Sequence, residues 1–234
     1  MAKEQLEARD LACVRGGRLV FGGLSLRLER GGALLVRGPN GAGKSSLLRL
    51  LAGLLPPAAG WTTNPFRTAY LGHDNALKPD RSLTQELRFW ARLDGTGMRW
   101  RDALDRFDLT ALADLPTGVL SSGQKRRAAL ARSWASGAEL WLLDEPSVGL
   151  DAASLDRLAV ACADHRAAGG LIVAATHVPM GIDDGDVLTL DPSPLEGEGQ
   201  ASEASQGAGA ASGALCPHPG RPAATPPPRA GREG

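Results

Sequence analysis

The sequence predicts an α/β fold built around a mostly parallel sheet, and three observations lead to this prediction. Apolar runs at 33–36, 140–143 and 171–175 are typical of strands that are buried on both faces. Segments with helical spacing alternate with these runs along the chain. A glycine-rich turn joins the first run to one such helical segment. Because crossovers between such strands are right-handed, the alternation favours parallel strands.

Two further strands are expected before the first buried strand. Residues 6–12 and 18–28 alternate apolar and polar side chains on either side of a turn at 15–18. This alternation is typical of antiparallel strands, which here lead into the buried strand at 33–37. A helix follows the glycine-rich turn, and the residues between it and a short strand predicted at 68–71 read as a loop.

Residues 80–136 have a different character and are predicted to form a helical insert. Ser82 and Gln85 have the spacing of a capping box at a helix N-terminus. Apolar residues then recur at helical spacing, and two more helical stretches are expected around 100–104 and near 109–115. The Trp and Phe side chains of the insert are interpreted as core residues rather than functional ones.

The α/β pattern resumes at Gly137, with a helix predicted over 152–168 and a last short strand at 187–190. Beyond these, the composition changes to Pro, Gly, Ala and Ser. Such a segment cannot bury enough apolar surface to offset its ordering entropy. The sequence therefore predicts one folded unit over 1–191 and a disordered tail over 192–234.

The composition limits the class of protein. The 26 Lys and Arg residues balance 26 Asp and Glu residues, which argues against a broad nucleic-acid-binding surface. No apolar run approaches the roughly 18 residues that would span a bilayer, and the N-terminus lacks an apolar signal core. Cys13, Cys162 and Cys216 are too few and too far apart for a disulfide framework or a zinc site. We expect a cytosolic protein that reaches a membrane only through a partner.

The glycine-rich turn has the spacing G-x-x-x-x-G-K-S of a phosphate-binding P-loop. Glycines allow several backbone N–H groups to point at one anion, and the helix that follows adds its dipole. Lys44 is expected to reach the β- and γ-phosphates, and the Ser45 hydroxyl to bind Mg²⁺. The predicted nucleotide-binding residues are Gly38, Pro39, Asn40, Gly41, Ala42, Gly43, Lys44, Ser45 and Ser46. The alternative, a glycine-rich turn that matches by accident, is disfavoured by the strand and helix that flank it.

Further polar side chains follow two of the buried strands, at the edge of the sheet where the P-loop lies. Asp144 and Glu145 come directly after the strand at 140–143, and His177 follows the strand at 171–175. Asp144 can hold Mg²⁺, and Glu145 can orient or deprotonate an attacking water. His177 can donate a hydrogen bond to the γ-phosphate. A solvated acidic turn and a surface histidine are the alternatives.

A second anion-binding feature lies before the basic helix at 125–132. Here a Ser hydroxyl and exposed N–H groups meet a helix N-terminus, in the residues Ser121, Ser122, Gly123 and Gln124. One chain needs only one phosphate cradle, so these residues are expected to bind the nucleotide of a partner subunit. A capped surface helix with a solvated charged face is an alternative that this segment alone does not exclude.

Taken together, these stretches resemble the ATP-binding cassette ATPases over about residues 4–190. In family order, the Walker A motif is 38–45, the signature 120–124, the Walker B motif 140–144 followed by Glu145, the D-loop 147–151 and the switch residue His177. The resemblance implies a P-loop nucleotide-binding domain of the ABC type, with an N-terminal antiparallel β subdomain and a small helical insert. It also implies ATP and Mg²⁺ as ligands and head-to-tail dimers. In such dimers Ser121 and Gly123 close on the ATP of the other subunit, and Asp151 communicates between the two sites.

Three positions depart from the general family pattern. Ser122 stands where glycine is usual, and His73 stands where a metal-sensing glutamine is expected. The N-terminal aromatic residue that stacks on adenine is missing, and Phe21 or Arg15 can substitute for it.

The departures point to one group within the family. Residues 13–21, 37–40, 70–73 with 77–79, and 87–91 resemble the ATP-binding subunits of the haem exporters of c-type cytochrome biogenesis. This implies a peripheral ATPase on the cytoplasmic face of the bacterial inner membrane, working with integral membrane subunits and not with nucleic acid. Two alternatives stay open: the ATPase subunit of another exporter, for drugs or ions, and a soluble ATPase without a transport role.

Overall fold

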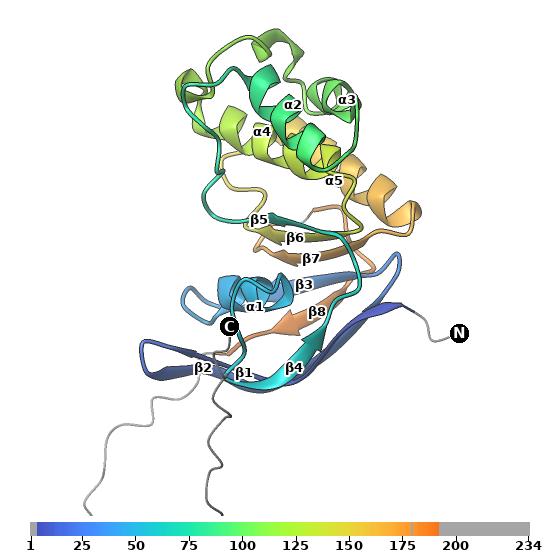
Figure 1. Ribbon diagram of the computed structural model, residues 1–234. Helices are drawn as coiled ribbons and strands as arrows, with labels where there is room; N and C mark the ends of the chain where they lie inside the picture. The colour runs from blue at the N-terminus through green and yellow to red at the C-terminus, as the bar shows by residue number, and fades with distance from the viewer. Residues whose placement is uncertain (1–3, 179, 192–234) are drawn as a thin grey trace, which may run out of the picture. The chain divides into compact units, whose positions relative to one another are not determined.

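A parallel sheet of five strands forms the centre of the structure, a computed structural model that describes residues 4–178 and 180–191 (Figure 1). The strands lie in the order β5-β6-β7-β3-β8. Their bounds are Ala33–Arg37 for β3, Thr68–Leu71 for β5, Leu140–Asp144 for β6, Leu171–Ala175 for β7 and Asp186–Thr189 for β8. All neighbouring pairs are parallel, which confirms the predicted α/β class.

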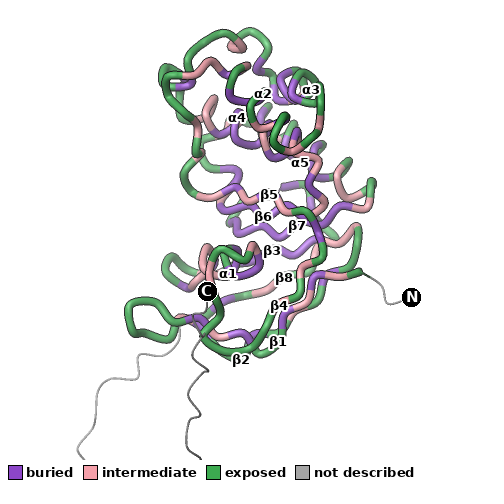
Figure 2. The backbone as a smooth tube through the Cα atoms, in the orientation of Figure 1, coloured by how far each residue is buried: buried purple, intermediate pink, exposed green. Residues whose placement is uncertain are grey.

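Successive side chains of the central strands enter two different hydrophobic cores. In β6, Trp141 and Leu143 belong to one core, whereas Leu140 and Leu142 belong to the other. Side chains alternate between the two faces of a strand, so a strand covered on both faces must be apolar at every position. Both β6 and β7 are buried along their whole length, as Figure 2 shows. This is the physical reason for their continuous apolar runs.

Helices cover both faces of the sheet (Figure 1). On one face lies α1 (Lys44–Leu51), whose buried leucines share a core with a second, antiparallel sheet. On the other face lie α4 (Ser122–Ala135) and α5 (Ala152–Ala167), together with the helices of the insert. The predicted helix over 152–168 is confirmed by α5, which begins after Asp151.

The antiparallel sheet contains three strands in the order β2-β1-β4. The expected pair is confirmed by β1 (Gln5–Arg15) and β2 (Arg18–Glu29), although both strands are longer than the alternation indicated. The interpretation of the whole stretch before 68 as a loop was wrong, because β4 (Ala59–Thr63) pairs with β1. The side chains of β4 are mostly exposed, so its strand character comes from hydrogen bonding to β1 and not from an apolar pattern.

The helical insert begins as predicted and then differs. Ser82 forms a capping box with Gln85 at the start of α2 (Leu83–Leu93), and α3 spans Arg99–Arg106. The helical stretch expected near 109–115 was wrong, since this region contains only the short 3₁₀ turns Thr110–Leu112 and Thr117–Val119. The carbonyls of Ala113 and Leu115 accept hydrogen bonds from the first N–H groups of α2. The first N–H groups of α2 thus find the outside acceptors that the start of a helix needs.

The aromatic residues of the insert only partly form core. Trp100 and Phe107 are buried, as expected. Phe89 is 40% exposed, and the guanidinium of Arg81 lies 4.6 Å from its ring centroid. The interpretation of every aromatic residue here as core was therefore wrong for Phe89.

His165 of α5 is half-buried against the central sheet. Its ring stacks on Trp141, with the two ring centroids 4.0 Å apart. Its Nε2 atom lies 3.1 Å from the carbonyl oxygen of Glu139 and 3.3 Å from that of Leu171, so Nε2 is the nitrogen that carries a proton. Burial lowers the pKa of His165, and the two carbonyl contacts oppose this shift.

The predicted tail at 192–234 lies outside the described residues. Within 4–178 and 180–191, no helix is both long and apolar enough to cross a membrane.

Candidate active site

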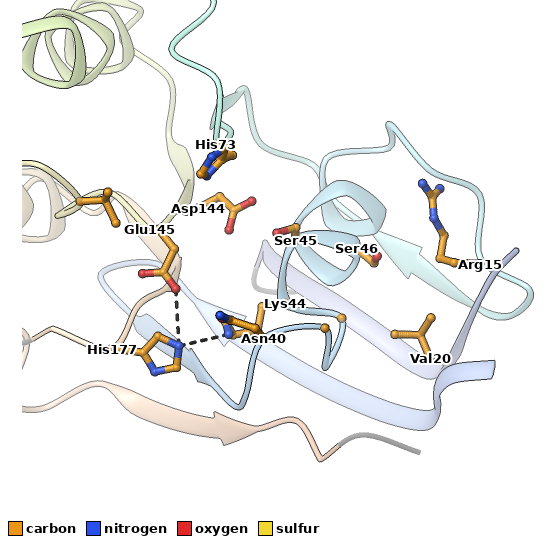
Figure 3. A pocket seen from close by; sticks show the side chains of 13 residues that line it. Arg15, Val20, Asn40, Lys44, Ser45, Ser46, His73, Asp144, Glu145 and His177 are labelled. Atoms are coloured by element: carbon orange, nitrogen blue, oxygen red, sulfur yellow. Dashed lines mark hydrogen bonds and ion pairs between the residues drawn. The ribbon is translucent and has the colours of Figure 1, made fainter. Parts of the chain in front are cut away.

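An open cavity of about 720 Å³ lies at the carboxyl edge of the parallel sheet (Figure 3). Its lining residues are Arg15, Val20, Asn40, Gly41, Gly43, Lys44, Ser45, Ser46, His73, Asp144, Glu145, Val148 and His177. The fold thus brings together side chains from the P-loop, from the ends of β6 and β7, and from the antiparallel sheet. Figure 3 shows Glu145 and His177 on one side of Lys44, with Ser45 and Ser46 on α1.

The P-loop takes its shape from glycines that no other residue could replace without strain. Gly38 has φ +140°, and a Cβ atom there would lie 2.3 Å from the carbonyl oxygen of Leu190. Gly43 has φ +99°, and a Cβ atom there would lie 2.5 Å from Cγ1 of Val20. Gly43 also begins α1, which has no side-chain cap. The first N–H groups of this helix therefore have no competing side-chain acceptor, which suits an anion.

Lys44 connects the loop to His177. It is 8% exposed, and its ammonium group donates to the carbonyl oxygens of Gly38 at 2.7 Å and Pro39 at 3.1 Å. Its Nζ atom also lies 3.2 Å from Nε2 of His177. These three contacts use all three N–H groups of the ammonium. The same His177 nitrogen also lies 3.6 Å from a carboxylate oxygen of Glu145, so the three side chains lie next to one another in the cavity.

Asp144 and Glu145 end β6 in two different environments. Asp144 is 3% exposed, and among the described residues its Oδ2 atom is buried without a hydrogen-bond partner. A buried carboxylate oxygen without a partner is costly, and a bound cation would satisfy it. Glu145 has φ +48°, and its backbone N–H donates to the carbonyl oxygen of Ala175 at 2.8 Å. Its carboxylate faces His177 in the cavity (Figure 3).

The orphaned Asp144 oxygen fits a magnesium ion, which prefers oxygen ligands. Ser45 of α1 lines the same cavity and offers a hydroxyl oxygen. Among residues 4–178 and 180–191, no group of three or more His, Cys, Asp or Glu side chains could hold a metal. A site with few protein ligands is usual for magnesium bound together with phosphates.

The structure separates the two candidates for the adenine contact. Phe21 is 5% exposed and belongs to a hydrophobic core, where its ring lies directly beneath Gly43. It is therefore not available for stacking. Arg15 lines the cavity, as does Val20, which sequence reasoning missed. The alternation along β2 could have placed Val20 on the face opposite Phe21, but it gave no reason to expect a ligand there.

The signature residues lie outside this cavity in their own chain. The Ser121 hydroxyl accepts a hydrogen bond from the Gln124 backbone N–H, and the Gln124 side chain accepts one from the Ser121 backbone N–H. The helix is thus capped by its own side chains. A Cβ atom at Gly123 would lie 2.5 Å from the carbonyl oxygen of Gly149, so the start of α4 lies against the D-loop.

The remaining predicted residues occupy distinct positions. His73 lines the cavity, and Figure 3 shows it beside Asp144. Asp151 caps α5 by accepting a hydrogen bond from the Ser154 backbone N–H at 2.9 Å, and its hydrogen bonds to Ser154 lower its pKa. Gly38, Pro39 and Ala42 belong to the loop but do not line the cavity, and Ala42 is buried.

The sequence is similar to known transport proteins. A family model described as ABC transporter matches residues 21–148. The cytochrome c biogenesis ATP-binding export protein CcmA of Paramagnetospirillum magneticum is 48% identical, over 82% of this chain and 96% of the relative. CcmA of Rhodospirillum rubrum is 50% identical over 81% of this chain and 88% of the relative. CcmA of Sphingopyxis alaskensis is 52% identical over 77% of this chain and 93% of the relative.

Solved structures share the fold. An ABC transporter ATP-binding protein from Pyrococcus furiosus matches with a TM-score of 0.70 at 24% identity, over 80% of this chain and 97% of the other. The ATP-binding subunit of another ABC transporter matches with a TM-score of 0.72 at 22% identity, over 81% of this chain and 88% of the other. With the relatives, they confirm the predicted P-loop fold of the ABC type. This chain belongs to the ABC transporter family and, within it, to the CcmA family of ATP-binding export proteins.

Proposed function

We propose that this chain is the ATP-hydrolysing subunit of the haem exporter complex of c-type cytochrome biogenesis. In this role it couples ATP binding and hydrolysis to integral membrane subunits and works as a peripheral protein on the cytoplasmic face of the bacterial inner membrane. The observation that carries the proposal is the meeting of Lys44, Glu145 and His177 in one cavity, in a chain about half identical to CcmA proteins.

Nucleotide binding uses groups that already converge on the cavity. The N–H groups of the P-loop and of the first turn of α1 receive the phosphates. Lys44 exchanges its contacts with the carbonyls of Gly38 and Pro39 for contacts with the β- and γ-phosphates. In this exchange the ammonium leaves uncharged carbonyl oxygens for anionic phosphate oxygens, so that donor and acceptor are both charged.

Hydrolysis depends on the carboxylate of Glu145. Glu145 orients a water molecule and accepts its proton as the water oxygen attacks the γ-phosphorus, and ADP leaves. His177 lies within 3.6 Å of the Glu145 carboxylate and 3.2 Å of the Lys44 ammonium, so it can bond the γ-phosphate between them. Ser45 and Asp144 would hold Mg²⁺, which when bound neutralises charge on the phosphates.

The second half of the site comes from another copy of the chain in this proposal. Ser121 and Gly123 lie outside their own cavity, at the exposed start of α4. In a head-to-tail dimer they close on the ATP held by the partner's P-loop. The capping box gives the Ser121 hydroxyl a fixed position before the partner arrives.

The mechanism is tested by ATP hydrolysis in the complex assembled with its membrane subunits. Glu145→Gln and Lys44→Ala should each abolish turnover, and Glu145→Gln should still bind ATP because its P-loop is intact. Glu139→Gln is the matched control, since Glu139 precedes the opposite end of β6 and bonds Arg30 far from the cavity. Wild-type turnover in Glu145→Gln would refute the mechanism.

The cargo is tested by genetic complementation. Deletion of this chain should abolish c-type cytochromes, and the wild-type chain but not Glu145→Gln should restore them. Normal cytochromes after deletion would refute the haem exporter role and favour an exporter of another molecule. Salt-dependent binding of the chain to DNA or RNA would instead favour a role without transport.

A further inference from the structure

Arg126 is a buried cation on the helix that begins with the signature residues. It lies in the second turn of α4 and is 4% exposed. Burial lowers the pKa of its guanidinium, while the nearby charges of Asp144 and Glu145 oppose this. A charge buried to this extent persists only if its hydrogen-bonding groups are satisfied.

Each of the five N–H groups of the Arg126 guanidinium has an acceptor, and all five acceptors are uncharged oxygens. Three of the acceptors belong to the segment 144–146: Nη2 donates to the carbonyls of Asp144 and Glu145, the latter at 2.7 Å, and Nε donates to the carbonyl of Pro146 at 3.4 Å. The other two belong to the segment 72–75: Nη1 donates to the Gly72 carbonyl at 2.9 Å and to the Asn75 side chain at 3.1 Å. A guanidinium that only neutralised charge would contact a carboxylate. These contacts instead fix the path of two backbone segments.

The first segment, 144–146, carries both carboxylates of the site. Glu145 has φ +48°, a left-handed conformation that is unfavourable for residues other than glycine. Such a conformation persists only where the surroundings hold it. Ala175 accepts a hydrogen bond from the backbone N–H of Glu145, and Arg126 donates to the carbonyls on either side of that residue and to its own. The position of the Glu145 carboxylate therefore depends on Arg126.

The second segment, 72–75, carries His73 to the other side of the cavity. Arg126 holds it at Gly72 and Asn75, the residues that flank His73 and Asp74. A single side chain of α4 thus joins the water-activating carboxylate, the His73 segment and the signature helix.

We propose that Arg126 is a positioning residue for ATP hydrolysis, which holds the 144–146 backbone so that Glu145 faces the γ-phosphate and ties this segment to 72–75 and to α4. The inference rests on the proposed function, because it assigns Arg126 a part in the same reaction. Arg126 does not line the cavity, and its five N–H groups all bind protein oxygens, so its loss should affect turnover and leave ATP binding intact.

Arg127 supplies a matched control. It is the next residue of the same helix, and it donates to the backbone carbonyls of Phe107 and Asp108 and to the Asp108 carboxylate, all in the helical insert. Lysine at either position keeps the charge but loses the planar set of five donors. Any general effect of weakening α4 should therefore appear in both variants.

The experiment measures ATP hydrolysis by the complex. The kcat is calculated per complex that binds a nucleotide analogue, so that unfolded protein does not lower its value. Arg126→Lys should lower kcat by about 10- to 100-fold, since a misplacement of about 1 Å can cost about 100-fold, with KM for ATP within about 3-fold. Arg127→Lys should keep kcat within about 2-fold. Equal kcat in the two variants, or a parallel loss of ATP binding in Arg126→Lys, would overturn the proposal.

If Arg126→Lys does not fold, Asn75→Ala decides the question. This change removes one acceptor from the guanidinium in a half-buried loop residue. It should lower kcat by about 3- to 10-fold without changing ATP affinity, and unchanged kcat would overturn the inference. An inactive wild-type complex would refute the proposed function itself, whereas an active wild type with a fully active Arg126→Lys refutes only the role of Arg126.

Discussion

Replacing Gly43 with alanine should destabilise the protein more than the same change at Gly41. The two glycines lie in the same loop, and both have positive φ, +99° and +85°. An alanine at either position therefore suffers the left-handed penalty of about 1–2 kcal/mol. The two differ in the space around the new methyl group, so their comparison isolates the effect of crowding.

The crowding at Gly43 can be estimated from distances. Its new methyl would lie 2.5 Å from Cγ1 of Val20 and 2.9 Å from Cδ1 of Phe21, whereas no atom lies within 4 Å at Gly41. Optimal carbon contacts are about 3.5–4.0 Å, and Phe21 is fixed in the core. Overpacking of this kind costs about 1–3 kcal/mol. Since each kcal/mol lowers Tm by about 2–4 °C in a chain of this size, Gly43→Ala should melt lower than Gly41→Ala by about 2–12 °C.

Urea and thermal unfolding of the nucleotide-free protein, followed by fluorescence of its 5 tryptophans, would measure this difference. Val20→Ala in the Gly43→Ala background should recover part of the loss, because it removes the nearest clashing atom. Equal midpoints for Gly43→Ala and Gly41→Ala would refute the reasoning, as would a double variant no more stable than Gly43→Ala.

Three further predictions concern pH, capping and thiol chemistry. Because burial lowers the pKa of His165, its contribution to stability is complete above about pH 6.5 and is lost as the pH falls below that value. His165→Phe should flatten this decline in urea titrations, and an unchanged decline would contradict the assignment. Ser121→Ala and Ser82→Ala each remove a capping box and should each cost about 1 kcal/mol of stability in urea unfolding. Only Ser121→Ala should lower ATPase turnover, so equal turnover in the two would argue against the dimeric site. Burial raises the pKa of Cys162 to about 12, so this thiol should resist iodoacetamide at about pH 8 until urea unfolds the chain, as peptide mass mapping would detect. Rapid labelling of the native protein at Cys162 would contradict its burial.

The sheet could be predicted from the sequence because its central strands are buried on both faces. That burial leaves a continuous apolar run at 140–143 and at 171–175, which no surface element would show. The strand β4 could not be predicted, since its side chains are exposed and its hydrogen bonds go to a strand about 50 residues earlier. The absence of a helix at 109–115 could not be predicted either, because the carbonyls of this stretch accept hydrogen bonds from the start of α2, which is distant in the sequence.

Much of the candidate site could also be anticipated, because Lys44, Asp144 and His177 follow strands that end at one edge of the sheet. Arg126 could not, because it belongs to a run of basic residues that reads equally well as a solvated helix face. Only the structure shows that one member of this run is turned inward and uses all of its donors.

The order of strands also determines when during synthesis the nucleotide site can form. The hairpin of β1 and β2 pairs locally and can fold early on the ribosome. Ala33 of β3, however, pairs with Ile172, and Leu35 pairs with Val187. A nascent chain therefore carries the apolar P-loop strand β3 without a partner until β7 has been made, and with one unpaired edge until β8 follows. ATP can stabilise only the finished chain, so translation that stalls earlier should leave a species prone to aggregation that nucleotide cannot rescue.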